Sequence, residues 1–297
     1  MNLRGELVEA APVGEGLVNS VYRLTLRRPH AIYALRVHAG DTVSFQRELH
    51  LLASLENALP VPRVLLADGS RSRFTHAYVV YPWIEGISLN HCRRASAPEV
   101  LLALAGRLGE LLARVAASDV PPARDHARSI AHRLEVADRL LQSGHARVWL
   151  GDAMADALRT RLVDESSRLP LLDHATDLVH GDLGGRNVLV RQRADGAWTI
   201  SGLLDWECAA TGSPLWDVGS LFRYHRRYST EFRDRFAGGY RAAGGELPDD
   251  WWLVARLLDA TRLIGILEED RELPSVFAEC RELIEDLTFQ DPHPSAR

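Results

Sequence analysis

The pattern of the chain changes near Gly86, and that change restricts the fold more than any other feature of the sequence. Before it, short apolar and β-branched runs end in glycine and are broken by one helical pattern, which is typical of strands around a helix. After it, apolar residues recur three and four positions apart over long stretches, the spacing of amphipathic helices. The order predicts an α+β fold with two lobes: a small β-rich N-lobe over residues 1–86 and a larger, mainly helical C-lobe over residues 87–297.

The individual runs predict the elements of each lobe. Two strands are expected around a glycine-containing turn within residues 7–28, with further strands within 31–38, 61–69 and 76–86 and a helix over 41–56. Helices are expected over residues 97–118, 124–144 and 151–169, with Ser96 as the N-cap of the first and Pro98 in its first turn. Short strands within residues 178–190 and 198–207 interrupt the helices, and more helices fill the C-terminal third.

The charge balance and the apolar content restrict the partners of the chain. The formal net charge is −5 and the hydrophobic fraction 46%, which is ordinary for a globular protein and offers no basic field for nucleic acid. The N-terminal residues are charged and no apolar run is long enough to span a bilayer, so neither a signal peptide nor a membrane partner is expected. Three widely separated cysteines predict no disulfide framework and indicate the reducing cytoplasm.

One stretch, "LVHGDLGGRNVLV" at residues 178–190, combines reactive side chains with flexible glycines between two apolar runs. Asp182 is a competent proton acceptor, and Asn187 offers an oxygen to a hard cation. Asp205 follows Asn187 by 18 residues, and a strand, a turn and a second strand between them would bring the two side chains together. One carboxylate, one amide oxygen and the phosphates of a nucleotide form a suitable Mg²⁺ site.

Phosphoryl transfer also needs groups that position the phosphates, and the N-lobe offers them in order. The loop "GEGLVNSVY" at residues 14–22 is expected to turn backbone amides towards phosphates. Arg36 on the third strand is expected to contact the phosphates, and Glu48 on the following helix to hold Arg36 in place. The chain has no lysine, so arginine takes this role with a broad fork in place of a point charge. The loop residues expected to bind the nucleotide are Gly14, Gly16, Asn19 and Ser20.

These motifs together resemble the aminoglycoside phosphotransferase family, which includes choline-kinase-like and other small-molecule kinases and shares the protein-kinase fold. The resemblance runs from the glycine loop near Gly14 to "WDVG" near Asp217, and more loosely to the C-terminus. The family's His-Gly-Asp-x-x-x-x-Asn motif is present at residues 180–187, and "LLDWE" carries its metal-binding aspartate at Asp205. Two positions depart from the usual pattern: Asn19 stands in place of the third loop glycine, and Arg36 in place of a lysine.

The resemblance implies a two-lobed protein-kinase-like fold and a role for each matched residue. It makes Asp182 the catalytic base, gives Asn187 and Asp205 to magnesium, and makes Asp217 a brace for the catalytic loop. It also implies that the backbone of the segment from Val80 to Trp83 receives the nucleotide base. The residues expected there are Val80, Tyr81 and Trp83.

Several nearby residues keep two interpretations each. His180 is either a brace that hydrogen-bonds the loop, as favoured here, or a general base. Glu207 either approaches the metal or substrate or lies on the surface, and Arg186 contacts either phosphate or solvent. The acidic run at residues 268–270 is either an acceptor-binding cluster or, as favoured here, a solvated helix face. Four tryptophans are divided between an acceptor pocket and the core: Trp206, Trp216, Trp251 and Trp252.

The resulting prediction is a phosphotransferase that uses Mg²⁺ and moves the γ-phosphate of ATP or GTP to a hydroxyl group of a small molecule. The family resemblance favours an antibiotic, aminoglycoside-like or macrolide, as the acceptor. A kinase of another metabolite (an amino alcohol, a sugar or homoserine) and a non-catalytic nucleotide-binding regulator are the alternatives. A protein kinase is disfavoured, because only eleven residues separate Asp205 from Asp217, too few for a peptide-docking segment.

Overall fold

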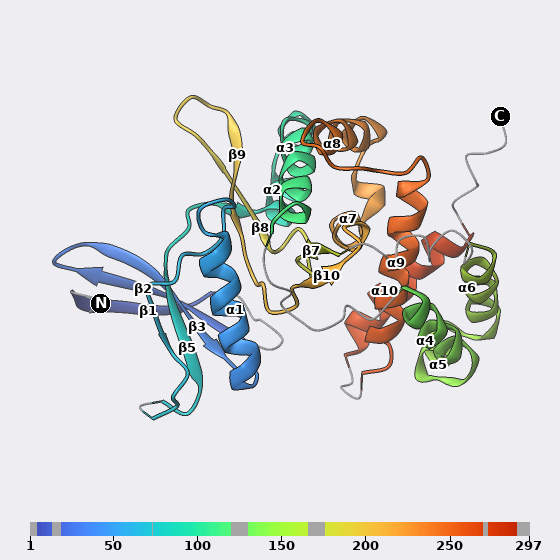
Figure 1. The fold of residues 1–297 in the computed structure, drawn as a ribbon, viewed down its shortest axis with the longest axis horizontal. Helices are drawn as coiled ribbons and strands as arrows, with labels where there is room; N and C mark the ends of the chain where they lie inside the picture. The colour runs from blue at the N-terminus through green and yellow to red at the C-terminus, as the bar shows by residue number, and fades with distance from the viewer. Residues whose placement is uncertain are drawn as a thin grey trace.

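A β-rich N-terminal part lies beside a mainly helical C-terminal part (Figure 1). The computed structural model describes residues 5–13, 19–72, 74–119, 130–165, 176–269 and 273–289. Both the α+β class and the arrangement of strands before helices agree with the sequence prediction. Within the described residues, no helix has both the length and the apolar composition needed to cross a membrane.

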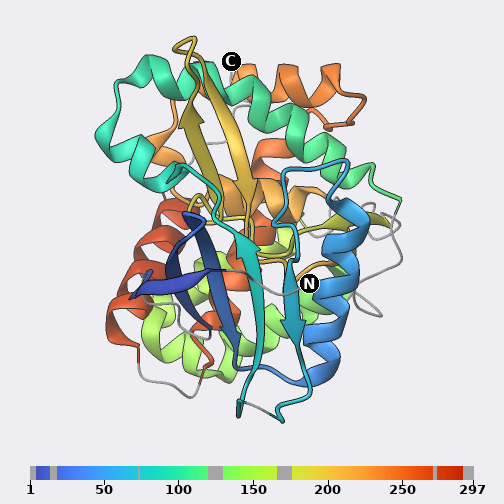
Figure 2. The same ribbon diagram turned by 90° about the vertical axis from the view of Figure 1, so that its left-hand side faces the viewer.

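The N-terminal part is a five-stranded antiparallel sheet with the order β1-β2-β3-β5-β4 and one helix, α1, along its side (Figure 2). Helix α1 begins at an N-cap, Asp41, whose carboxylate accepts a hydrogen bond from the Ser44 N–H at 2.9 Å. Its apolar face, which includes Phe45 and Leu52, is buried. The elements are β1 (Glu6–Pro12), β2 (Ser20–Arg27), β3 (Ala31–His38), α1 (Thr42–Leu55), β4 (Leu66–Asp68) and β5 (Ala77–Pro82).

The C-terminal part combines two small sheets with a set of helices. The strands β6, β8 and β9 form one antiparallel sheet, and β7 pairs with β10 in the other. The strands are β6 (Ile87–Ser88), β7 (Asp177–Val179), β8 (Val188–Gln192), β9 (Trp198–Leu203) and β10 (Ala210–Gly212). The helices are α2 (Leu89–Ala95), α3 (Pro98–Ala116), α4 (Ile130–Ser143), α5 (His145–Leu150), α6 (Asp152–Glu165), α7 (Leu215–Leu221), α8 (Thr230–Ala242), α9 (Trp251–Ile266) and α10 (Pro274–Phe289).

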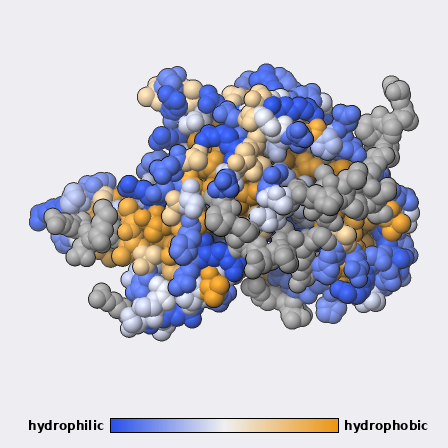
Figure 3. Space-filling view, viewed as in Figure 1, coloured by the Kyte–Doolittle hydropathy of each residue, from blue (hydrophilic) through white to orange (hydrophobic). Residues whose placement is uncertain are grey.

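The cores of the two parts differ in composition. In the C-terminal part, the Phe222 ring makes edge contacts with the rings of Phe236 and Trp251, at centroid distances of 5.0 and 6.1 Å. In the N-terminal part the core is mainly aliphatic, and β1 leaves Leu7 and Val8 more than half exposed. The space-filling view shows apolar side chains gathered over the N-terminal sheet (Figure 3).

The predicted N-cap of one helix was wrong. Ser96 is the C-cap of α2, because its N–H donates to the Cys92 carbonyl at 2.9 Å, and the N-cap of α3 is Ala97. The strand expected within residues 61–69 is present as Leu66–Asp68, where the chain pairs with β5. The sequence also missed α5, β6 and β10, which are too short to carry a periodic pattern of their own.

Candidate active site

Arg36 contacts three carboxylates, one from the N-terminal part and two from the C-terminal part. Its Nη1 donates to Glu48 Oε1 at 2.5 Å, as the sequence predicted. Its Nη2 donates to Asp205 Oδ1 at 2.5 Å and to Glu207 Oε2 at 3.0 Å. Burial acts to lower the pKa of Arg36, but Glu48 and Asp205 outweigh it and raise that pKa, so the guanidinium stays charged. One cation facing three carboxylates leaves an excess of negative charge, which suits an additional cation.

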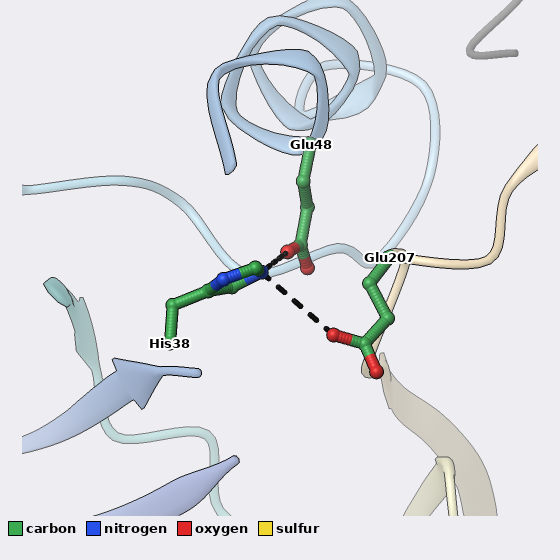
Figure 4. Close-up of side chains that lie close together, drawn as sticks. All are labelled: His38, Glu48 and Glu207. Carbon is green, nitrogen blue, oxygen red and sulfur yellow. Dashed lines mark ion pairs between the residues drawn. The ribbon is translucent and has the colours of Figure 1, made fainter. Parts of the chain in front are cut away.

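His38 lies beside this network, two residues after Arg36 on the same strand. Its Nε2 is 3.7 Å from Glu48 Oε2 and 3.7 Å from Glu207 Oε2 (Figure 4). Burial and the positive charge of Arg36 lower the pKa of His38, so the ring is neutral at pH 7. Both carboxylates also bind Arg36, whose fixed charge opposes a divalent cation at this position.

Asn19, at the end of the predicted glycine loop, is held by both parts of the molecule. Its Oδ1 accepts from the Ala39 N–H at 3.0 Å, and its Nδ2 donates to Glu207 Oε2 at 2.7 Å. Ser20 is exposed at the start of β2, where it pairs with Val37 of β3. The other two loop residues of the prediction, Gly14 and Gly16, lie outside the described residues.

The segment predicted to receive the nucleotide base, residues 80–83, is largely occupied by the sheet. The Val80 carbonyl accepts from the Leu65 N–H at 2.9 Å, and the Trp83 N–H donates to the Ile32 carbonyl at 3.1 Å. A base cannot use the Trp83 N–H without breaking its bond to Ile32, so this part of the prediction requires another backbone donor of the segment. The Tyr81 ring is buried, and burial together with the Glu48 carboxylate raises the pKa of its phenol.

Asp217 at the start of α7 fixes the loop that follows β7. Its carboxylate accepts hydrogen bonds from the N–H groups of His180 at 2.6 Å and Gly181 at 2.9 Å. This is the bracing role that the family resemblance implied. Burial raises the pKa of Asp217, and the hydrogen bond to His180 opposes that rise. Gly181 has a φ of +79°, and a Cβ at this position would collide with the Cys208 carbonyl.

His180 braces the same loop, as expected. Its Nε2 is 2.8 Å from the Leu204 carbonyl, and its Nδ1 accepts from the Asp182 N–H at 3.3 Å. These contacts assign the proton of a neutral ring to Nε2. The imidazole also packs against the buried Trp206 ring, at a centroid distance of 4.6 Å. His180 therefore connects the loop that carries Asp182 to the segment just before Asp205.

The three acidic and amide residues of the prediction converge at this loop. Asn187 Nδ2 donates to the Asp182 carbonyl at 2.8 Å, which leaves the amide oxygen as the atom able to coordinate a cation. The Leu204 N–H donates to the Asn187 carbonyl at 2.8 Å, so strands β8 and β9 return Asp205 to the position that the sequence predicted. Asp205 has a φ of +68°, an uncommon conformation for a residue with a side chain and one that clusters at functional sites.

Two arginines hold the carboxylate of Asp182. Arg262 Nη2 donates to Oδ1 at 2.8 Å, and Arg186 Nη2 donates to Oδ2 at 2.7 Å. Burial acts to raise the pKa of Asp182, but Arg262 and Arg186 outweigh it and lower that pKa. The sequence left Arg186 open between phosphate and solvent, and it gave no sign of Arg262, which lies on α9 outside any motif.

The remaining sequence candidates lie away from these groups or in the core. Trp206 and Trp251 are buried core residues. Glu268 accepts a hydrogen bond from the Ala146 N–H at 2.6 Å and so caps the start of α5. Asp270, from the same acidic run, lies outside the described residues.

Comparison with known proteins gives a family match. The model of the phosphotransferase enzyme family matches residues 9–258. Viomycin phosphotransferase from Streptomyces vinaceus is 32% identical to the chain over 176 residues. The match covers 58% of this chain and 59% of that protein, so it spans less than two thirds of the relative's length.

Solved structures of low sequence identity share the fold. The GDP and kanamycin complex of APH(2")-IIia has a TM-score of 0.74 at 18% identity, covering 95% of this chain and 93% of that chain. A thermostable mutant of aminoglycoside phosphotransferase APH(4)-Ia with AMP-PNP and hygromycin B has a TM-score of 0.66 at 18% identity, covering 94% of each chain. These likenesses confirm the predicted two-lobed, protein-kinase-like fold.

Proposed function

The chain belongs to the phosphotransferase enzyme family, and on that premise we propose that it transfers the γ-phosphoryl group of ATP or GTP to a hydroxyl group of a small molecule. The observation that carries this proposal is the convergence of Asp182, Asn187 and Asp205 on one loop, with Arg36 tied to Asp205 from the other part of the molecule. These are the groups that phosphoryl transfer requires: a base, hard oxygen ligands and a cation for the phosphates.

Each side chain has a distinct task in this proposal. Asp182 orients the acceptor hydroxyl and takes its proton as the oxygen attacks the γ-phosphorus. Arg36, held by Glu48, contacts the phosphates of the nucleotide. Asp217 keeps the loop rigid through the two backbone N–H groups that it accepts, so that Asp182 stays at a fixed distance from the phosphates.

The residues present fit a magnesium ion. The Asn187 amide oxygen and the Asp205 carboxylate are hard oxygen donors, and the carboxylates around Arg36 leave an excess of negative charge. Asn187 and Asp205 would hold the ion, and Arg36 would release Asp205 in favour of a phosphate oxygen. A bound magnesium ion supplies charge neutralisation at the phosphate oxygens.

For the acceptor we propose an antibiotic. Support comes from the relative named for viomycin and from the fold neighbours solved with kanamycin and hygromycin B. The neighbours also hold GDP or AMP-PNP, which supports a nucleotide co-substrate of either base. We place the boundary between the nucleotide-binding N-lobe and the acceptor-binding C-lobe at Gly86. We place the protein in the cytoplasm, in keeping with three cysteines that form no disulfide.

Mass spectrometry of small molecules tests the proposal. The protein is incubated with magnesium and either ATP or GTP, and with a panel of viomycin, kanamycin, hygromycin B, a macrolide, choline, homoserine and simple sugars. We expect an antibiotic to gain the mass of one phosphoryl group with the wild-type protein and to remain unmodified with Asp182→Asn. Transfer confined to choline, homoserine or a sugar would overturn the antibiotic assignment. Nucleotide binding without transfer to any compound would favour a regulator.

A further inference from the structure

The carboxylate of Asp182 has an arginine on each oxygen, and the two arginines are held differently. Arg262 is on helix α9, its side chain is 26% exposed, and it bonds through both terminal nitrogens: Nη2 to Asp182 Oδ1 at 2.8 Å and Nη1 to the Gly181 carbonyl. Arg186 is on the loop, its side chain is 62% exposed, and its Nη2 bonds Asp182 Oδ2 at 2.7 Å. One arginine is fixed to the loop backbone, and the other is free to turn into solvent.

In this arrangement both oxygens of the Asp182 carboxylate already accept hydrogen bonds from arginines. An acceptor hydroxyl must come within hydrogen-bond distance of a carboxylate oxygen to give up its proton. Of the two arginines, Arg186 at Oδ2 is the partner that a hydroxyl group can displace, since Arg262 is also held by its second bond to the Gly181 carbonyl. Arg186 is the easier of the two arginines to displace, because its side chain is 62% exposed and water can take over its hydrogen bonds.

Resting on the proposed function, we propose that Arg262 is a positioning residue that fixes Asp182 and that Arg186 is a catalytic residue that passes from Asp182 to the transferred phosphoryl group. When the acceptor hydroxyl takes the place of Arg186 at Oδ2, the guanidinium is released beside the reacting atoms. The phosphorus that bonds to that hydroxyl oxygen then lies one bond beyond it, next to the position that Arg186 has left.

Atoms and charges balance in the proposed step. The acceptor oxygen forms a bond to the γ-phosphorus, the bond from that phosphorus to the β–γ bridging oxygen breaks, and the hydroxyl proton passes to Asp182 Oδ2. A nucleoside diphosphate leaves with the electron pair. During this step the equatorial phosphoryl oxygens carry negative charge, and an arginine placed against them lowers the barrier. Arg186 thus pairs with the Asp182 carboxylate before the reaction and stabilises the negative charge of the phosphoryl oxygens during it.

Four variants separate these roles: Arg186→Gln, Arg262→Gln, Arg262→Lys and, as control, Arg193→Gln. Arg193 has a similarly exposed side chain (58%) paired with Asp195 in the turn after β8. Turnover is measured with the acceptor identified by the panel and, as a second reaction, with water as acceptor in basal ATP hydrolysis. Nucleotide KM and the melting temperature are measured in parallel.

We expect Arg186→Gln to lower kcat by on the order of 10³-fold with the nucleotide KM and melting temperature retained, as for other arginines that stabilise phosphoryl transfer. Arg262→Gln should lower kcat by about 10²-fold through misplacement of Asp182, and Arg262→Lys should restore part of it. Arg193→Gln should match the wild type.

Two results would overturn the inference. If the wild type turns over and Arg186→Gln leaves kcat unchanged or raises it, Arg186 is only a surface partner or a block on Asp182. If Arg262→Gln lowers the melting temperature and its kcat is fully retained, Arg262 is a structural residue. A wild type without transfer to any acceptor, water included, would instead reject the proposed function itself.

Discussion

At the scale of single residues, Arg36 shows how one side chain can connect the two parts of the molecule. A planar guanidinium reaches Glu48 with one nitrogen and Asp205 and Glu207 with the other. A lysine ammonium carries its three donors on one nitrogen, so it does not span these carboxylates in the same way. The arginine that stands in place of the usual lysine therefore makes contacts with three carboxylates that a lysine would not make in the same way.

Replacing Arg36 tests that role. Arg36→Ala removes charge-assisted hydrogen bonds, which contribute about 1.5–3 kcal/mol each, so kcat/KM for the nucleotide should fall by roughly 10- to 100-fold. Steady-state kinetics with varied nucleotide measure this. Arg27→Ala is the control, because Arg27 pairs with Glu6 on the exposed surface of the same sheet. Equal kinetics in the two variants would remove Arg36 from the nucleotide site.

How far the site can be predicted from sequence depends on how many positions separate its residues along the chain. Asp182 and Asn187 share one loop, and Asp205 returns to it by two paired strands, so a local pattern was enough to place all three. The contact between Asp182 and Arg262 joins residues that are 80 positions apart and belong to no shared motif. Nor does sequence reveal that Asn19 bonds Glu207, because that contact depends on how the two parts of the molecule meet.

At the scale of elements, α3 and α8 approach each other through glycines. A Cβ on Gly109 would collide with the Phe236 carbonyl, and one on Gly239 with the Gly106 carbonyl. The long helices of the C-terminal part were predicted from their periodicity, but this close approach was not, since a glycine within a helix carries no signal of its packing partner. Elements of two or three residues, such as β6 and β10, were missed because distant pairing defines them.

A pair of glycine substitutions tests the helix contact. Gly109→Ala should lower the free energy of unfolding by about 1–3 kcal/mol, because the added methyl group overpacks the contact with α8. Gly238→Ala, on the same helix pair but with nothing within 4 Å of a Cβ, should raise it by about 0.4–1 kcal/mol. Urea denaturation measures both. A stable Gly109→Ala protein would show that the two helices lie further apart.

At the scale of the whole molecule, His225 links stability to pH. Burial, followed by the charges of Arg256 and Arg226, lowers the pKa of His225 from 6.5 to about 4. Between these values the unfolded chain binds a proton that the folded chain does not, so the free energy of unfolding should fall as the pH falls from 6.5 to about 4.

Denaturation across this pH range checks the linkage. His225→Gln should remove part of the decline, because the variant has no group that titrates at this position. His76→Gln is the control, since His76 is exposed in the bend just before β5. A decline as steep in His225→Gln as in the wild type would assign the effect to other groups.

We propose Asp182 as the base of a phosphoryl transfer between the two parts of the molecule. The most direct measurement is the transfer of labelled γ-phosphate by Asp182→Asn, with nucleotide binding followed by calorimetry and Asp195→Asn, in the exposed turn after β8, as control. We predict a turnover lower by about 10²- to 10⁴-fold with nucleotide affinity retained, and a control equal to the wild type. Turnover equal to the wild type, or loss of nucleotide binding together with turnover, would contradict the role assigned to Asp182.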